Sequence, residues 1–204
     1  IGVRLVGSEM CIRDRFSTVY KRFFSLRIRE QGISEECKEG TSFMTKSIAI
    51  KSAFSCGGKA WDYLEHISCK NVVLIRDSQM SQGVSNIVSK IRTYMDSMGV
   101  IMGEYDIGGD KLSQIQLIGG IQFMSEKKPD MVIAIGSELT IKIAKLMLIF
   151  YEYPELANST IENADTKGKS LHTRLVVISG DSEEAEGVNQ VNFIKIDSDD
   201  LKFE

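Results

Sequence analysis

The stretch Ala134–Lys145, AIGSELTIKIAK, has the residue types and spacing of a phosphate-binding turn. It follows the apolar run Met131–Ile133 and passes into a helix-like pattern, so it predicts a strand, a tight turn and a helix. In nucleotide-binding folds the N-terminus of such a helix binds the phosphates. Such turns normally need several glycines, whereas this one offers Gly136 followed by Ser137 and Glu138. The stretch therefore predicts either a cofactor site or one that has closed.

A second candidate is Asp77, which closely follows the apolar strand-like run Asn71–Ile75. In open α/β sheets, ligands bind beyond the carboxyl ends of the strands. A carboxylate at the end of a second strand accepts hydrogen bonds from both ribose hydroxyls of a dinucleotide. The alternative is that Asp77 caps a turn before Ser78. The residues themselves leave both interpretations open.

Strand-like and helix-like segments alternate from Lys46 onward. Apolar β-rich runs predict strands, and apolar residues at helical spacing predict the helices between them. The expected strands are 48–54, 71–75, 100–105, 131–135, 174–178 and 191–196, and the expected helices are 57–67, 84–98, 111–125 and 139–151. Short connections between alternating elements require right-handed crossovers. The predicted fold is α/β, a doubly wound, largely parallel Rossmann-like sheet with helices on both faces.

The first residues differ in character from the rest. The segment Gly2–Arg15, GVRLVGSEMCIRDR, has neither helical nor strand periodicity and resembles translated sequencing-adapter sequence. Residues 1–15 are therefore expected to be a non-native extension. Residues 16–45 are either upstream reading frame or a leader with a short amphipathic helix, with Met44 as a candidate start. A Rossmann-like domain of the nucleotide-binding type is expected to span residues 46–204.

The composition of the chain argues against two classes of function, nucleic-acid binding and membrane insertion. The chain of 204 residues is 43% hydrophobic and 26% charged, which is ordinary for a globular domain. A net charge of −3 argues against a nucleic-acid binder, because affinity for the phosphate backbone depends on clustered Lys and Arg. The most apolar run, Ile141–Tyr151, is interrupted by lysines and falls short of the roughly 20 residues of a membrane span. We expect neither nucleic acid nor a membrane as partner.

Cysteine and histidine usage points to a reduced setting without a metal. The four cysteines include no Cys-x-x-Cys pair and follow no export signal, so a cytoplasmic location is expected. His66 and His172 are far apart in the sequence and have no partner at ligand spacing. No metal site is therefore expected within the chain.

Several motifs, in their order and spacing, resemble the iron-containing alcohol dehydrogenase family, specifically its N-terminal nucleotide-binding half. Phe54–Gly57 resembles the family's opening Phe-Gly-x-Gly turn, and Val73–Met80, VLIRDSQM, resembles its strand ending in Val-Thr-Asp. Ala134–Lys145 stands where the family carries Ala-Ile-Gly-Gly-Gly-Ser-x-x-Asp-x-x-Lys. Tyr151–Leu156, YEYPEL, resembles the segment that follows this helix. The resemblance covers about Ile48–Glu204.

The resemblance implies a domain that binds NAD(P). Asp77 matches the acidic residue that bonds the adenosine ribose, and Lys202 matches a basic residue shortly after the last strand. Ser182 lies in Ser179–Gly187, SGDSEEAEG, which stands where the family has a hydroxyl-rich cofactor loop. The implied cofactor contacts are Asp77, Gly136, Ser137, Lys145, Ser182 and Lys202. Iron is expected in the family, but its ligands, an Asp and three His, belong to a helical second half with no counterpart here, so no catalytic residue or metal ligand is assigned.

The phosphate turn departs from the family pattern. Ser137 and Glu138 replace two glycines and Lys142 replaces the helix Asp, so that only Gly136 and Lys145 of the signature remain. Two unit charges about 4 Å apart repel by about 4 kcal/mol at an effective dielectric of 20, so Glu138 would oppose a pyrophosphate. The same residues also suit a helix end that needs no ligand, with Ser137 as the N-cap and Glu138 complementing the dipole.

These departures predict the NAD(P)-binding half of an alcohol or aldehyde oxidoreductase in which NAD binding is weak or lost and catalysis is impaired or absent. The carboxylates between positions 181 and 186, which replace neutral donors in the second loop, favour the same conclusion. The alternative is a non-catalytic α/β domain that binds a partner or another small ligand. The partners expected are a second copy of the chain or the family's C-terminal domain.

Overall fold

The computed structural model describes residues 45–56, 64, 68–109, 111, 113–158, 165–179 and 188–197. The chain divides into two units, Ile1–Ser42 and Phe43–Glu204, and all the described residues belong to the second. The helix expected at 57–67 lies outside the described residues except for position 64. Two predicted cofactor contacts, Ser182 and Lys202, also lie outside them.

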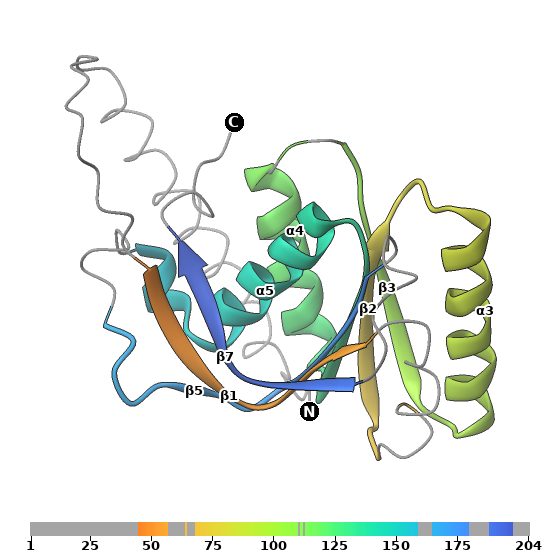
Figure 1. Cartoon of the computed structure of the whole chain (residues 1–204), viewed down its shortest axis with the longest axis horizontal. Helices are drawn as coiled ribbons and strands as arrows, with labels where there is room; N and C mark the ends of the chain where they lie inside the picture. The colour runs from red at the N-terminus through yellow and green to blue at the C-terminus, as the bar shows by residue number, and fades with distance from the viewer. Residues whose placement is uncertain are drawn as a thin grey trace, which may run out of the picture. The chain divides into compact units, whose positions relative to one another are not determined.

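Seven strands among the described residues form one sheet in the order β3-β2-β4-β6-β1, and β5 and β7 also pair with β1 (Figure 1). All neighbouring strands are parallel except β7, which runs antiparallel to β1. The strands are β1 (Thr45–Cys56), β2 (Asn71–Asp77), β3 (Ile101–Ile107), β4 (Met131–Gly136), β5 (Ser170–Leu171), β6 (Arg174–Ser179) and β7 (Val188–Asp197).

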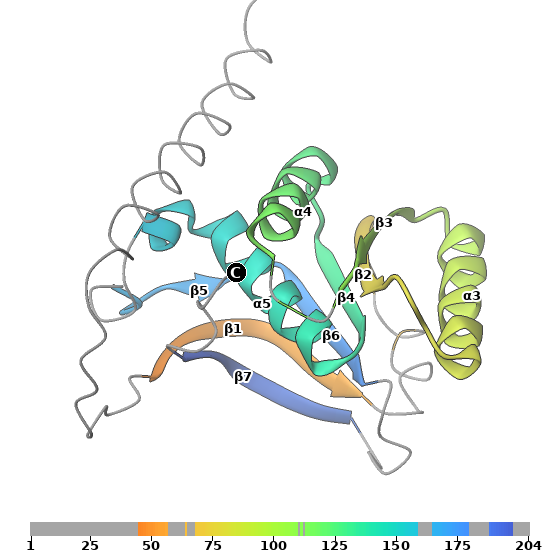
Figure 2. The ribbon, with the colours of Figure 1, turned by 90° about the horizontal axis from the view of Figure 1, so that it is seen from above.

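Helices cover both faces of the sheet. Helix α3 (Gln82–Ser97) lies on one face, and α4 (Gln114–Lys127) and α5 (Glu138–Glu152) lie together on the other (Figure 2). A short 3-10 helix, η1 (Pro154–Asn158), follows α5. The prediction of a doubly wound, largely parallel α/β fold is confirmed.

Continuous apolar runs in the central strands explain this two-sided packing. Successive side chains of a strand point to opposite faces, so a strand buried on both faces has no polar alternation. In β2, Val72 and Leu74 pack in the α3 core together with Val88 and Ile91. The alternate residues Val73 and Ile75 are equally buried and face the α4 and α5 side. Both cores meet at β4, all of whose residues are buried.

Short polar residues set where the helices begin. At α3, the side chain of Ser81 accepts a hydrogen bond from the backbone N–H of Val84 (3.4 Å), which satisfies one donor of the first turn. The helix ends at its C-cap, Met98. The next residue, Gly99, has a φ of +68°, in the left-handed region that glycine adopts without strain. The expected bounds of α3, 84–98, are therefore close to those observed.

The structure adds two features of the sheet that hydrophobic patterning did not give. Strand β5 has only two residues, too few for a periodic signal, and pairs with β1 through Ala49 and Ile50. Strand β7 was expected as a strand, but its antiparallel direction against β1 depends on tertiary pairing. Periodicity identifies a strand and its buried face, whereas its neighbours are set by the rest of the chain.

The end of α5 is fixed to the turn between β5 and β6 by one carboxylate. Glu152 accepts hydrogen bonds from the backbone N–H of His172 (2.8 Å to Oε2) and of Thr173 (2.7 Å to Oε1), and its side chain is only 11% exposed. The neighbouring Tyr153 hydroxyl donates to the carbonyl of Ser170 and accepts from its N–H. The segment YEYPEL thus joins the helix to the edge of the sheet.

Replacing Glu152 with alanine should lower the free energy of unfolding by about 2 kcal/mol, because two backbone donors lose a charged acceptor. Urea denaturation followed by circular dichroism would measure the loss. Glu126→Ala, at an exposed position of α4, is the matched control and should change stability by less than about 0.5 kcal/mol. Equal effects of the two substitutions would contradict the anchoring role of Glu152.

Candidate functional site

The carboxyl ends of β2 and β4 lie side by side and bring two of the predicted site residues together. These strands pair in parallel, with Arg76 opposite Ile135. The next residues along the two strands are Asp77 and Gly136, which therefore lie at the same edge of the sheet. This is the edge at which open α/β sheets bind ligands. Helix α5 begins directly beyond Gly136.

The carboxylate of Asp77 lies against the N-terminus of α5. Its Oδ2 accepts a hydrogen bond from the backbone N–H of Ser137 (2.8 Å), and its Oδ1 accepts one from the Ser137 hydroxyl (3.1 Å). The hydroxyl of Thr140, a fully buried side chain, also donates to Oδ1. Three donors at the start of one helix thus converge on a single carboxylate. An anion at a helix N-terminus is favoured by these donors and by the helix dipole.

Ser137 completes the cap, as the sequence predicted. It has extended backbone angles, and its side chain accepts a hydrogen bond from the N–H of Thr140 (3.4 Å). Its carbonyl accepts the first helical hydrogen bond, from Ile141. The hydroxyl of Ser137 therefore accepts from the helix backbone and donates to Asp77. The N–H groups of Ser137 and Thr140 at this end of α5 thus have acceptors within the chain.

Gly136 makes the approach of Asp77 possible. Its φ is +140°, in the region that residues with a Cβ rarely adopt. A Cβ at this position would clash with Oδ2 of Asp77 and would lie 2.7 Å from its carboxyl carbon. The single glycine of the turn therefore admits a carboxylate of the same chain.

Two acidic groups lie at this helix end, Glu138 as predicted from the sequence and Asp77 from the neighbouring strand, and they differ in exposure. Glu138 is the first residue of α5, but its side chain is exposed, where solvent screens its charge. Asp77 is the carboxylate held against the Ser137 N–H. Its carboxylate also does not cap the turn before Ser78, because the N–H of Ser78 donates to the carbonyl of Ile107 (2.7 Å).

Lys145 is not part of this cluster. It lies on α5, eight residues beyond Ser137, which places it about 12 Å along the helix axis from the capped end. Thr140 is the site residue that sequence reasoning missed. Its signal was its position three residues after a Ser N-cap, where a side chain at the start of a helix commonly takes part in capping.

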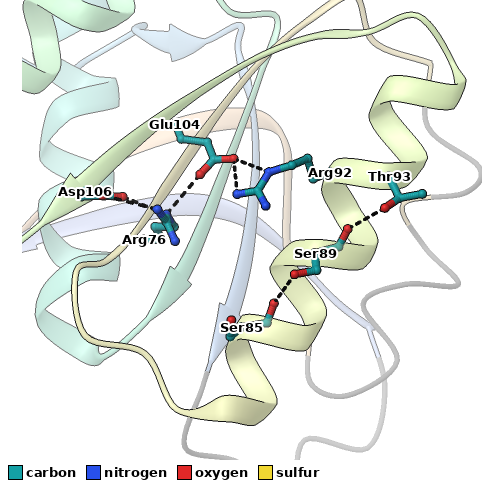
Figure 3. Close-up of polar contacts among 7 residues, drawn as sticks. All are labelled: Arg76, Ser85, Ser89, Arg92, Thr93, Glu104 and Asp106. Carbon is teal, nitrogen blue, oxygen red and sulfur yellow. Dashed lines mark hydrogen bonds and ion pairs between the residues drawn. The ribbon is translucent and has the colours of Figure 1, made fainter.

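Arg76 fixes the strand end that carries Asp77, from the opposite face of β2. Its Nε lies 2.8 Å from Oδ1 of Asp106 and 3.3 Å from Oε2 of Glu104, both on β3. Arg92 of α3 joins the same network, with Nη2 2.6 Å from Oε1 of Glu104 (Figure 3). These ion pairs therefore connect β2, β3 and α3 next to the candidate site.

The turn after β3 is fixed by contacts with α4. The side chain of Gln116 donates to the carbonyl of Gly108 (2.6 Å between Nε2 and O), and the hydroxyl of Tyr105 donates to the carbonyl of Gln116 (2.7 Å). Burial raises the pKa of Tyr105, which keeps its hydroxyl protonated as a donor. These two hydrogen bonds connect the turn to α4, whereas the buried Oε1 of Gln116 has no hydrogen-bond partner among the described residues.

The described residues offer neither a metal centre nor a membrane span. No group of three or more His, Cys, Asp or Glu among them is placed to hold a metal ion. In the same part of the chain, no helix has both the length and the apolar character needed to cross a bilayer.

Comparison with known proteins identifies the fold. An iron-containing alcohol dehydrogenase from Thermococcus thioreducens is 20% identical with a TM-score of 0.50, and the match covers 65% of this chain and 36% of that one. An alcohol dehydrogenase from Oenococcus oeni is 13% identical with a TM-score of 0.50, covering 66% and 35% of the two chains. The chain thus spans little more than a third of these structures. No family profile and no curated protein matches the sequence.

Replacing Gly136 with alanine should lower the free energy of unfolding by about 1 to 3 kcal/mol, because the new Cβ is strained at this φ and displaces the Asp77 carboxylate. Gly83→Ala is the matched control. Gly83 lies in the first turn of α3, where a Cβ would meet only the Ser81 hydroxyl oxygen at 3.9 Å. The control should be neutral or stabilising by up to about 1 kcal/mol. Chemical denaturation measures both, and a tolerated Gly136→Ala would contradict the close approach.

Proposed function

We propose that this chain is a nucleotide-fold domain of the iron-containing alcohol dehydrogenase type that does not bind a dinucleotide at the start of α5 and serves as a non-catalytic α/β domain. Two observations support the relationship to that type: the sequence motifs between Phe54 and Leu156, and the fold shared with the alcohol dehydrogenases of Thermococcus thioreducens and Oenococcus oeni. Fold alone does not carry function, so the proposal rests on the site.

The observation that carries the proposal is the carboxylate of Asp77 at the N-terminus of α5. A pyrophosphate at this position needs the N–H groups of the first turn and an open approach past the glycine. Here the N–H of Ser137 already donates to Asp77, and the space beside Gly136 is filled by the same carboxylate. The residues present therefore do not fit a dinucleotide phosphate.

The ribose contact that the resemblance implies is lost by the same interaction. Asp77 is the residue expected to accept hydrogen bonds from the adenosine ribose. Its Oδ1 accepts from the hydroxyls of Ser137 and Thr140 and its Oδ2 from the N–H of Ser137, so the helix uses three of the roughly four acceptor positions of the carboxylate and leaves too few for both ribose hydroxyls. One side chain thus removes the phosphate position and the ribose acceptor together.

The absence of catalysis in the proposal follows from this geometry. Hydride transfer in a nicotinamide enzyme requires a dinucleotide held with its reactive ring against the substrate, and the protein contributes that binding and orientation. A chain that cannot hold the phosphates of the dinucleotide cannot orient the ring. The proposed role is therefore that of a folded scaffold. In this proposal the chain does not catalyse alcohol or aldehyde chemistry.

Titration with NADH, followed by its fluorescence, tests the proposal. The native chain should give no saturable change up to about 1 mM NADH, a concentration that detects binding free energies of about −4 kcal/mol or more favourable. Glu138→Gln should be equally inert, because the exposed Glu138 is not the group that closes the site. Saturable binding to the native chain would overturn the proposal. Binding gained by Glu138→Gln alone would restore Glu138 as the cause.

A further inference from the structure

Strand β3 is the last strand of the sheet on the side away from β1 (Figure 2). It pairs with β2 along its whole length, and no strand among the described residues pairs with its other edge. The edge of a sheet presents a row of backbone donors and acceptors to which another strand can be added. The outer edge of β3 is therefore a surface on which a partner strand can pair.

The backbone of β3 shows which residues would make that pairing. The N–H of Ile101 donates to the carbonyl of Lys70 (2.9 Å), at the start of the ladder between β3 and β2. In a parallel ladder, alternate residues direct both backbone groups at the same neighbour. Ile101 and the residues two and four positions later thus face β2, whereas the residues between them direct their N–H and C=O outward, namely Met102, Glu104 and Asp106.

Apolar side chains remain exposed at this edge. Ile101 is 66% exposed, and Met98, in the turn that leads into β3, is 61% exposed. They are two of the three large hydrophobic side chains that are exposed among the described residues. On the face of the sheet that α4 covers, the ring of Phe123 packs against Tyr105 with 5.6 Å between ring centroids. Phe123 also covers Gly103, where a Cβ would lie 2.9 Å from its Cζ.

The acidic side chains of β3 do not guard the edge. Charged residues on an edge strand usually oppose pairing with another strand. Here the Oε1 of Glu104 lies 2.6 Å from Nη2 of Arg92, and the Oδ1 of Asp106 lies 2.8 Å from Nε of Arg76 (Figure 3). Two positive charges of the same chain thus offset the two negative ones. A second edge of the same composition can approach without net repulsion.

We propose that β3 is a self-association edge, which pairs antiparallel with β3 of a second copy around a two-fold axis at Gly103. Such an axis uses the same patch on both copies, so the patch must complement itself. With Gly103 at the axis, Ile101 of each copy lies opposite Tyr105 of the other, and aromatic with β-branched cross-strand pairs are favourable. Met102 and Glu104 of the two copies then exchange backbone hydrogen bonds.

Other registers fit less well. An axis at Glu104 would place the two Glu104 side chains directly opposite one another, which is unfavourable for like charges. An axis at Met102 would place Ile101 opposite Gly103 and lose the contact with Tyr105. The register at Gly103 is therefore the one that the side chains select.

This inference goes beyond the proposed function and is independent of it. The edge of β3 is formed without any residue of the Asp77 and Ser137 contact, so NADH titration does not bear on it. One pair of strand edges buries less surface than the roughly 1,600 Å² of a standard interface, so the dimer is expected to be weak. We expect a dissociation constant on the order of 30 µM.

Sedimentation velocity of the full chain between about 5 and 300 µM tests the inference. The native chain should pass from mainly monomer to mainly dimer over this range. Ile101→Lys should weaken dimerisation by at least about 10-fold, because a charged lysine on an edge strand opposes pairing. Ile115→Lys is the matched control, since Ile115 is 83% exposed on α4 and lies outside the proposed contact. The control should dimerise like the native chain, and circular dichroism should show that both variants are folded.

Residue-resolved hydrogen exchange of the native chain gives a second test that needs no variant. Between about 20 and 300 µM, exchange of the outward N–H groups of Met102 and Glu104 should slow by about twofold or more. The N–H groups of Gly103 and Tyr105 already face β2 and should change less. This measurement decides the inference should Ile101→Lys fail to fold.

A native chain that stays monomeric up to about 300 µM overturns the inference and leaves the edge open to a strand of another protein. Dimers that persist unchanged in Ile101→Lys use another surface, and they overturn it as well. Dimers whose formation leaves the exchange of Met102 and Glu104 unaltered do the same.

Discussion

The start of helix α5 needs an acceptor for its first donors, and a carboxylate on a neighbouring strand supplies it. Backbone N–H groups in the first turn of a helix have no partner within the helix, and they concentrate positive potential at its end. In this fold the end of α5 points at the edge of the sheet where β2 and β4 stop. Asp77 is the last residue of β2, so its carboxylate reaches the Ser137 N–H directly.

The rest of the structure holds that contact in place. The parallel pairing of β2 with β4 sets the two strand ends level with one another, and Gly136 leaves room for the carboxylate between them. On the other face of β2, Arg76 connects the strand end to β3, and Arg92 connects β3 to α3 (Figure 3). The apolar cores on the two faces of the sheet hold α3 and α5, the helices that Arg92 and Asp77 connect to the strands.

The N-terminus of a helix that follows a parallel strand can be occupied in two ways. A helix that starts after a parallel strand offers an anion site, and a nucleotide-binding protein leaves it open for phosphate. In this chain the carboxylate of Asp77 lies at the start of the helix and accepts a hydrogen bond from the N–H of Ser137. Similarity of fold to alcohol dehydrogenases therefore gives the scaffold, and the site residues decide its use.

The sequence by itself determined the fold class, most element bounds and the cap at Ser137, because these follow from local periodicity and from short-range hydrogen bonding. It also predicted that the turn at Gly136 departs from a phosphate-binding pattern. Only the tertiary structure decided which carboxylate is bonded to the start of α5. Asp77 and Ser137 are 60 residues apart and meet because β2 and β4 are neighbours in the sheet. Glu138, adjacent in sequence, points to solvent, since position along a chain does not fix the direction of a side chain at a helix end.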